Sequence, residues 1–174
     1  MRYGRSGASP TIIILTLIGL VMFLFWAGTR IIAGISYEQD CGGYLKRAAD
    51  ANTIELADKE LTKAVTYIEG NGLTSGYTSV IYRTPDEDLG FWYSNLKASQ
   101  KELQEIDSEA TQLERTNVLM KLRETLLDDG ESGQSVTQPD GISVYPNNAV
   151  LWFLGLLSML MTCIFGVIWL GQST

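Results

Sequence analysis

The sequence contains no histidine, and this absence removes the commonest general base and the commonest ligand of transition metals. Cysteine is almost as scarce, and two residues cannot form a disulfide framework. Basic residues are outnumbered, 13 Lys and Arg against 20 Asp and Glu, and the net charge of −7 argues against nucleic-acid binding. We therefore expect no catalytic residues, no cofactor and no metal, and a protein that is not an enzyme.

Charge is also absent from two long apolar runs, residues 11–28 and 149–170. Each run is long enough to cross the ~30 Å hydrocarbon core of a bilayer as a helix. We predict one transmembrane helix over 11–35, with Arg30 near an interface, and a second over 149–170, with Trp152 and Trp169 near its ends. A cleaved signal peptide is the alternative for the first run, but no small-residue cleavage motif follows it.

The distribution of charge predicts how the chain is oriented. Arg2 and Arg5 precede the first run, whereas all 20 acidic residues lie between the two runs. The positive-inside rule then places short tails, 1–10 and 171–174, in the cytoplasm and the loop 36–148 in the periplasm or outside the cell. A bacterial inner membrane is the expected location, and an organelle membrane with the same sidedness is the alternative.

The loop 36–148 predicts an antiparallel helical hairpin. Apolar residues recur at spacings of three and four over 37–69, with a change of phase at 51–54 beside a possible helix cap at 52–55. The first part of this stretch can continue the helix of the first span. The glycines of 70–76 end the helix and form a connector, since no Gly-Lys-Ser/Thr motif of a phosphate loop follows. Residues 77–83 are expected to be an extended linker.

The second helix of the hairpin is predicted over 85–128. Thr84, Pro85 and Glu87 are typical of a helix start. Apolar residues then alternate at three and four positions over about six heptads, which indicates a coiled-coil seam. The seam positions are Leu89, Trp92, Leu96, Ser99, Leu103, Ile106, Ala110, Leu113, Asn117, Met120, Glu124 and Leu127. Residues 129–148 are rich in Gly, Ser and Pro and predict a flexible linker, and the acidic residues Asp128, Asp129, Glu131 and Asp140 lack EF-hand spacing.

Two groups of residues are predicted interfaces. The first is the seam together with the aromatic cluster 91–93, which either contacts a partner or covers the turn. The second is a small-residue face on the second span that lets another helix approach, unless it only reflects the composition of membrane helices; Thr16 and Gly19 form a smaller patch on the first span. The predicted interface residues are Leu89, Phe91, Trp92, Tyr93, Leu96, Leu103, Ile106, Leu113, Met120, Gly155, Ser158, Thr162 and Gly166.

Cys41 has two interpretations. In an oxidising compartment it can form an intermolecular disulfide, because it is the one cysteine of the loop. It is equally placed on a stripe with Tyr37 and Tyr44, where free cysteine behaves as a small buried apolar residue.

These observations predict an all-α membrane protein with two transmembrane helices flanking an extracytoplasmic antiparallel helical hairpin or coiled coil. The expected function is a non-enzymatic structural or accessory subunit of a membrane assembly, with other membrane subunits or copies of itself and the lipid bilayer as partners, and no nucleic acid. The layout resembles the sensory half of bacterial chemoreceptors. That resemblance implies the alternative, a ligand-sensing module that signals to a separate cytoplasmic partner, since residues 171–174 leave no room for a signalling domain.

Overall fold

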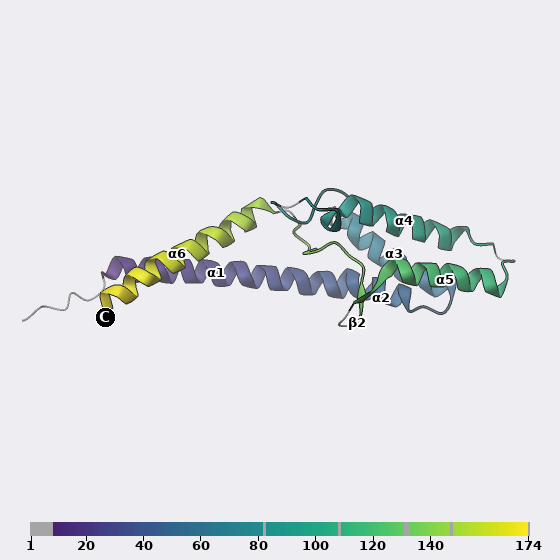
Figure 1. Cartoon of the computed structure of the whole chain (residues 1–174), viewed down its shortest axis with the longest axis horizontal. Coiled ribbons are helices and arrows are strands. Elements are labelled where there is room, and N and C mark those ends of the chain that lie inside the picture. Colours follow the sequence, from purple (N-terminus) through teal and green to yellow (C-terminus); the bar gives the residue numbers. More distant parts are fainter. Residues whose placement is uncertain (1–8, 82, 108, 131–132, 147, 174) are drawn as a thin grey trace, which may run out of the picture. The chain divides into compact units, whose positions relative to one another are not determined.

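The computed structural model describes residues 9–81, 83–107, 109–130, 133–146 and 148–173. The chain divides into two compact units, one formed by 1–32 with 148–174 and one formed by Ala33–Asn147 (Figure 1). We call them the membrane unit and the polar unit. The described elements confirm a predominantly helical protein with two long apolar helices, α1 (Pro10–Tyr37) and α6 (Ala149–Ser173). The helix α1 begins in the membrane unit and ends in the polar unit.

The chain remains helical past Tyr37. A π-helical turn, Glu38–Gly42, leads directly into α2 (Gly43–Ala49), which confirms that the loop begins by continuing the first span. The predicted change of phase is also confirmed, since α2 ends at Ala49 and α3 (Ile54–Gly70) starts anew. Thr53 caps α3, and its side chain accepts a hydrogen bond from the backbone N of Leu56 at 3.2 Å.

The glycine-rich connector ends α3 as predicted. Gly72 has φ of 68°, and beyond it the N–H of Leu73 donates to the carbonyl of Ile68 at 2.9 Å. This is the Schellman arrangement, in which a left-handed glycine turns the chain and the next apolar residue packs back on the helix. Leu73 is accordingly fully buried. The connector therefore ends α3, and its residue Leu73 packs back against that helix.

The single helix predicted over 85–128 is wrong. Thr84 and Glu87 do form a capping box, but the turn they start, η2 (Pro85–Glu87), ends at Asp88. The structure then has two helices, α4 (Leu89–Glu105) and α5 (Gln112–Leu126). The physical reason is a second capping box: Thr111 accepts from the N–H of Glu114, whose carboxylate accepts from the N–H of Thr111 at 2.7 Å.

The segment 129–148, predicted as a linker, contains regular structure in the part that the structure describes; Glu131 lies outside the described residues. Strands β1 (Leu127–Gly130) and β2 (Gly133–Val136) pair antiparallel, with Leu127 opposite Val136. Residues 137–146, which we call the clasp, then return across the polar unit. The hydroxyl of Thr78 donates to the carbonyl of Asp140 at 2.5 Å, and the N–H of Asp140 donates to the carbonyl of Asp86 at 3.1 Å.

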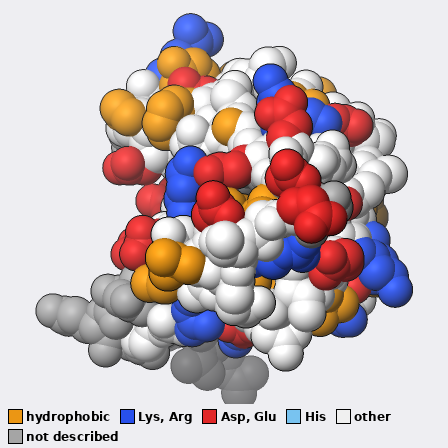
Figure 2. All heavy atoms as spheres, turned by 90° about the vertical axis from the view of Figure 1, so that its right-hand side faces the viewer, with side chains coloured by type: hydrophobic (Ala, Val, Ile, Leu, Met, Phe, Trp, Pro, Cys, Tyr) orange, Lys and Arg blue, Asp and Glu red, His pale blue; other side chains and the backbone are white. Residues whose placement is uncertain are grey.

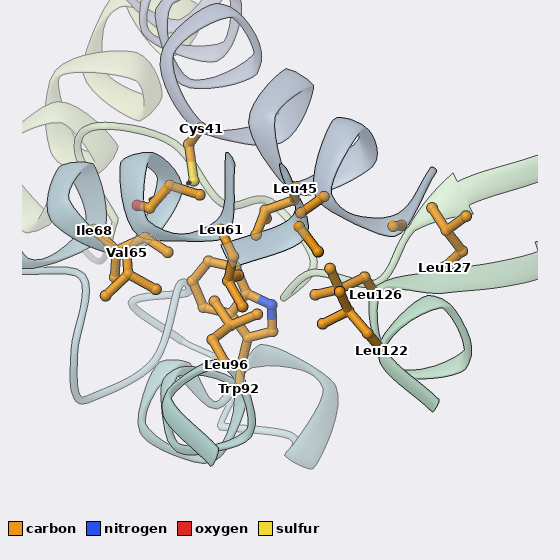
Figure 3. Packing of buried hydrophobic residues seen from close by; sticks show 14 of the residues in the cluster. Cys41, Leu45, Leu61, Val65, Ile68, Trp92, Leu96, Leu122, Leu126 and Leu127 are labelled. Atoms are coloured by element: carbon orange, nitrogen blue, oxygen red, sulfur yellow. Dashed lines mark hydrogen bonds between the residues drawn. The ribbon is translucent and has the colours of Figure 1, made fainter. Parts of the chain in front are cut away.

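The core of the polar unit is formed by α2, α3, α4 and α5 (Figure 3). Leu45 of α2, Leu61 of α3 and Leu96 of α4 are almost completely buried there, together with Leu126 at the end of α5. Ile142 of the clasp joins the same cluster. One continuous apolar core therefore holds segments from both ends of the unit's sequence.

Candidate functional site

The seam predicted on α4 points into the protein's own core. Leu89, Trp92, Leu96 and Leu103 are each less than a tenth exposed and belong to the core cluster, and Ile106 packs against it half-buried. Trp92 also donates from its indole N–H to the carbonyl of Thr137 at 3.0 Å. These residues form internal contacts that join α4 to α3 and to the clasp. The predicted seam of α4 is therefore buried and is not available to a partner.

The seam predicted on α5 faces outward. Leu113 is 70% exposed and Met120 is 56% exposed, and Asn117 between them is exposed too. The buried face of α5 carries Leu122 and Leu126 instead, because the second capping box restarted the helix in a different phase. Leu113 and Met120 lie two turns apart on one side of α5; we call them the α5 apolar face.

The aromatic cluster 91–93 has three separate environments. Phe91 is 67% exposed, Trp92 is buried, and Tyr93 is half-buried. The hydroxyl of Tyr93 donates to Glu69 at 2.7 Å, and this hydrogen bond lowers the pKa of the Glu69 carboxyl and raises the pKa of Tyr93. Two of the three aromatic residues therefore link α4 to its neighbours, and Phe91 alone remains free for an external contact.

The small-residue face of α6 lies against α1 within the membrane unit. A side chain at Gly19 would place its Cβ 2.9 Å from the backbone N of Thr162, and one at Gly155 would place it 2.5 Å from the Trp26 ring. Ser158 lies between these two contacts along α6 and is fully buried. The two patches predicted on separate spans thus contact each other. Contacts that advance along α1 recede along α6, so the two helices pair antiparallel.

Both long helices satisfy the length and composition needed to cross a membrane. In their most apolar 18-residue windows, 6% of the residues of the first and 11% of the second are buried inside the protein. A core helix of a soluble domain would be mostly buried. A contiguous apolar surface of this size is typical of contact with lipid or with another apolar helix.

A buried carboxylate joins α2 to α3. Glu60 is 1% exposed and lies 3.1 Å from Arg47 and 2.8 Å from Lys63. The hydrogen bond from Lys63 is the largest cause that lowers the pKa of Glu60; burial opposes it and the charge of Arg47 adds to it. The Lys63 ammonium also lies 4.9 Å from the centroid of the Tyr44 ring. This arrangement accounts for Glu60 as a structural ion pair.

Cys41 is completely buried, and its Sγ lies 4.0 Å from the carbonyl oxygen of Ala64. It is a free thiol, as is Cys163, which is exposed on α6. Burial of this kind favours the interpretation of Cys41 as a small apolar core residue. An intermolecular disulfide at Cys41 would require the polar unit to open.

A cleft of about 560 Å³ lies where the clasp meets the start of α4. It is lined by side chains and backbone from η2, α4, both strands and the clasp, which are distant from one another in the sequence. Four of the lining residues are acidic and none is Lys or Arg. The lining residues are Pro85, Asp86, Asp88, Phe91, Trp92, Asn95, Asp128, Ser135, Val136, Thr137, Gln138, Pro139, Asp140 and Gly141. Asp128 and Asp140 could be recognised in the sequence as acidic residues, but no sequence pattern placed them in a cleft.

The cleft differs from a metal centre. In the part of the chain that the structure describes, no three His, Cys, Asp or Glu side chains converge in a way that could hold an ion. Elsewhere on the polar unit, acidic and basic side chains alternate on the face presented in Figure 2, with small separate apolar areas between them. The charged residues that line the cleft are therefore all of one sign.

Comparisons with known proteins add no family to this description. No protein-family model matches the chain, and neither the curated proteins nor the solved structures give a match.

Proposed function

We propose that the protein is a non-enzymatic structural or accessory subunit of a membrane assembly, held in the bilayer by α1 and α6. The observation that supports this most strongly is the membrane unit itself. The two helices are in direct contact at Gly19, Gly155 and Ser158. Their shared face therefore leaves no space for an ion pathway. Two helices packed in this way serve as an anchor and as a docking surface for other helices.

The outer surface of the unit offers places for such docking. Ile14, Leu17, Ile18, Val21 and Met22 line a shallow, wholly apolar groove of about 310 Å³ on α1. In a bilayer, a groove of this kind accepts the side chains of a neighbouring transmembrane helix. The α5 apolar face and Phe91 supply a second surface on the polar unit. The proposed partners are other membrane subunits or further copies of this chain.

The proposed location is a bacterial inner membrane, with both tails in the cytoplasm and the polar unit on the far side. The support is the sequence alone, namely the arginines of the first tail and the acidic loop. Labelling by a membrane-impermeant thiol reagent tests this orientation. A cysteine that replaces Thr116, an exposed residue of α5, should react in intact cells, and one that replaces Ser6 should react only after lysis.

The subunit proposal is tested by the native mass of the complex after gentle detergent extraction. We expect a second protein at fixed stoichiometry, which is lost in the double variant Leu113→Ser/Met120→Ser. The matched control is Gln112→Ser/Glu124→Ser, which changes two exposed polar residues of the same helix and should retain the partner. A single 19.2 kDa chain would contradict the proposal, and multiples of 19.2 kDa alone would contradict the accessory role.

A ligand-sensing module is the second candidate function, and the acidic cleft is the observation that favours it. Ligand sites are commonly concave and between 300 and 1,000 Å³, and the cleft volume of about 560 Å³ lies within that range. Its walls come from η2 and α4 on one side and from the clasp, which leads to α6, on the other. A ligand in the cleft would therefore contact the segment that connects the polar unit to the second span.

A further inference from the structure

The outer face of α1 carries a repeat of seven residues. Apolar residues recur along it at alternating spacings of three and four, which are the a and d positions of a coiled coil. These positions, which we call the α1 seam, are Ile14, Leu17, Val21, Leu24, Gly28 and Ile31. Each of the five side chains, Gly28 having none, is more than half exposed. The seam therefore lies on the surface of the membrane unit.

The helix α6 lies on the other side of α1. Its contacts with α1 are at Gly19 and Trp26, which are seven residues apart and share one position of the repeat. At about 100° per residue, Gly19 lies about 140° around the helix from Ile14 and about 160° from Leu17. A further helix can therefore lie along the α1 seam without displacing α6.

The residue types along the α1 seam indicate what kind of helix fits it. The a positions of the first two repeats are β-branched, Ile14 and Val21, and the d positions are Leu17 and Leu24. In parallel coiled coils, this combination favours two strands. Copies of one chain cross a membrane in the same direction, so a parallel pair is the arrangement open to them. The β-branched residues are also fixed at χ1 in a helix, which gives the surface a defined shape before a partner binds.

The apolar groove of about 310 Å³ on α1 lies at the first repeat of the seam. Four of its lining residues, Ile14, Leu17, Ile18 and Val21, are the a, d, e and next a positions. In a parallel pair of helices, residues at these four positions surround one d side chain of the partner. Leu17 of a second copy lies at the same depth in the membrane and would therefore enter this groove.

The exposed area is sufficient for a dimer. The five side chains of the α1 seam and the neighbouring Ile18, which is 45% exposed, present on the order of 600 Å² per copy. Two copies could then cover up to about 1,200 Å², the lower end of the range for specific protein interfaces. In lipid, such contact stabilises a helix pair through close packing of side chains.

We propose that the α1 seam docks a second copy of this chain, so that the protein forms a parallel dimer in the membrane. Ile14 and Val21 face their counterparts, and Leu17 of each copy enters the groove of the other. This inference names the partner of the α1 groove, and it rests on the proposed function in requiring that α1 crosses a membrane. The α5 apolar face and Phe91 remain available to a different subunit.

Site-directed cross-linking of the full chain in native membranes tests the dimer. The starting chain is Cys163→Ser, which removes the exposed native thiol and leaves the buried Cys41. In this chain, Leu17→Cys should give a disulfide-linked dimer as the main product of oxidation with copper phenanthroline. The starting chain itself should give none.

The matched control is Ile164→Cys on α6, since Ile164 is 53% exposed and Leu17 is 54% exposed. Gly19 lies against Thr162 in the antiparallel pair, so residues two positions before Gly19 and two positions after Thr162 lie at the same depth. We expect the control to give at least about fivefold less dimer than Leu17→Cys, because side chains outside the seam meet only by collision. Equal yields at the two positions would overturn the proposal.

A truncation of the predicted contact gives a second readout. In the chain with Leu24→Cys as the cross-linking site, Leu17→Ala should lower the dimer yield about fivefold, because the groove of the other copy loses the side chain that fills it. Ile164→Ala should leave the yield unchanged. Equal effects of the two truncations would also overturn the proposal.

The mass of the cross-linked product identifies what covers the α1 seam. A product of twice the chain mass supports the dimer, a product with a different protein assigns the seam to a foreign subunit, and the absence of a product at Leu17→Cys assigns it to lipid. Either of the last two results would overturn the dimer.

The native-mass experiment is independent of this one, because it alters Leu113 and Met120 and leaves the α1 seam intact. A foreign subunit at fixed stoichiometry without a cross-link at Leu17→Cys would overturn the dimer alone. A cross-linked dimer without a foreign subunit would overturn the accessory role alone. Failure of one proposal is therefore distinguishable from failure of the other.

Discussion

The membrane unit and the polar unit both contain a close helix pair, but small residues contribute to only one of the two contacts. In the α1–α6 contact, Gly19 lies against Thr162 and Gly155 lies against the ring of Trp26, and the small side chain of Ser158 is buried between them. The contact between α3 and α4 is formed by large side chains such as Leu61 and Leu96 (Figure 3). In water, helices associate because large apolar surfaces leave the solvent. In lipid that driving force is absent, and close backbone approach takes its place.

The largest expected effect comes from truncating a large apolar side chain at the contact between α3 and α4. Leu61 is fully buried, and Leu61→Ala should lower the free energy of unfolding by about 2–5 kcal/mol, since a cavity remains in the core. Urea unfolding of the full chain in detergent, followed by far-UV circular dichroism, measures this. Leu113→Ala removes the same atoms from a side chain that is 70% exposed and should change stability by less than about 0.5 kcal/mol. Similar losses in both variants would contradict the burial described for the core.

The buried carboxylate of the polar unit has no counterpart among the contacts described for the membrane unit. Glu60→Gln should cost about 1.5–3 kcal/mol, the range for hydrogen bonds to charged groups. Because the folded pKa of Glu60 lies below the value of about 4.3 in unfolded chains, its stabilisation is complete above that pH and is lost as the pH falls through the folded pKa.

Unfolding measured between pH 7 and pH 3 checks this linkage. The native chain should lose more stability than Glu60→Gln as the pH falls below about 4.3, so the two curves converge in acid. Curves that remain parallel throughout would show that Glu60 is not the titrating group. Glu124→Gln, on the exposed surface of α5, should reproduce the native curve.

A small-to-large change breaks the contact between α1 and α6. Gly19→Leu places a side chain against the backbone N of Thr162, which cannot move aside as a flexible side chain would. We expect a loss of about 1–3 kcal/mol in the stability of the helix pair, measured by titration with SDS and Trp fluorescence. Gly28→Leu is the matched control in the same helix, because no atom lies within 4 Å of a Cβ built there. Equal sensitivity at both glycines would contradict the packing of the two spans.

The smallest effect concerns helix ends, which capping side chains define in the polar unit. Thr53→Ala removes the acceptor for the N–H of Leu56 and should cost about 1 kcal/mol. Thr66→Ala, an exposed position in the middle of the same helix, loses only a local bond to the carbonyl of Thr62 and should be nearly neutral. Thermal unfolding of the full chain in detergent compares the two variants. A larger loss at Thr66 would show that the Thr53 cap does not determine where α3 begins.

Several local features could be predicted from the sequence because neighbouring residues determine them. The start of a new helix near Thr53, the capping box of Thr84 with Glu87 and the glycine-rich stop after α3 all depend on hydrogen bonds within one turn. The two apolar runs were equally clear. Short-range signals of this kind need no knowledge of the rest of the fold.

The break between α4 and α5 was missed although its signal is local. Thr111 and Glu114 form a capping box that a long heptad pattern concealed, because Leu113 and Met120 happened to continue the spacing of the α4 seam. The strands and the clasp carried no comparable signal. The position of the clasp depends on the hydrogen bonds of Trp92 with Thr137 and of Thr78 with Asp140, which join residues far apart in the sequence.

The candidate sites also divide into features that neighbouring residues determine and features that depend on contacts between distant segments. The small-residue patches of both spans could be recognised from composition, but the sequence did not reveal that each is the other's partner. The cleft was missed altogether, since Asp86, Phe91, Asp128 and Gln138 come together only after the clasp folds back. Binding surfaces assembled from distant segments leave no periodic pattern in a single sequence.

The capping box at Thr111 has a consequence for how this sequence can vary in length. In an uninterrupted helix, removing one residue rotates every later side chain by about 100° and would turn a buried face toward solvent. Here α5 takes its phase from its own first turn, because the capping box of Thr111 starts the helix anew after α4 has ended at Glu105. A residue inserted or deleted between Glu105 and Thr111 would leave Leu122 and Leu126 directed at the core, whereas the same change inside α5 would not.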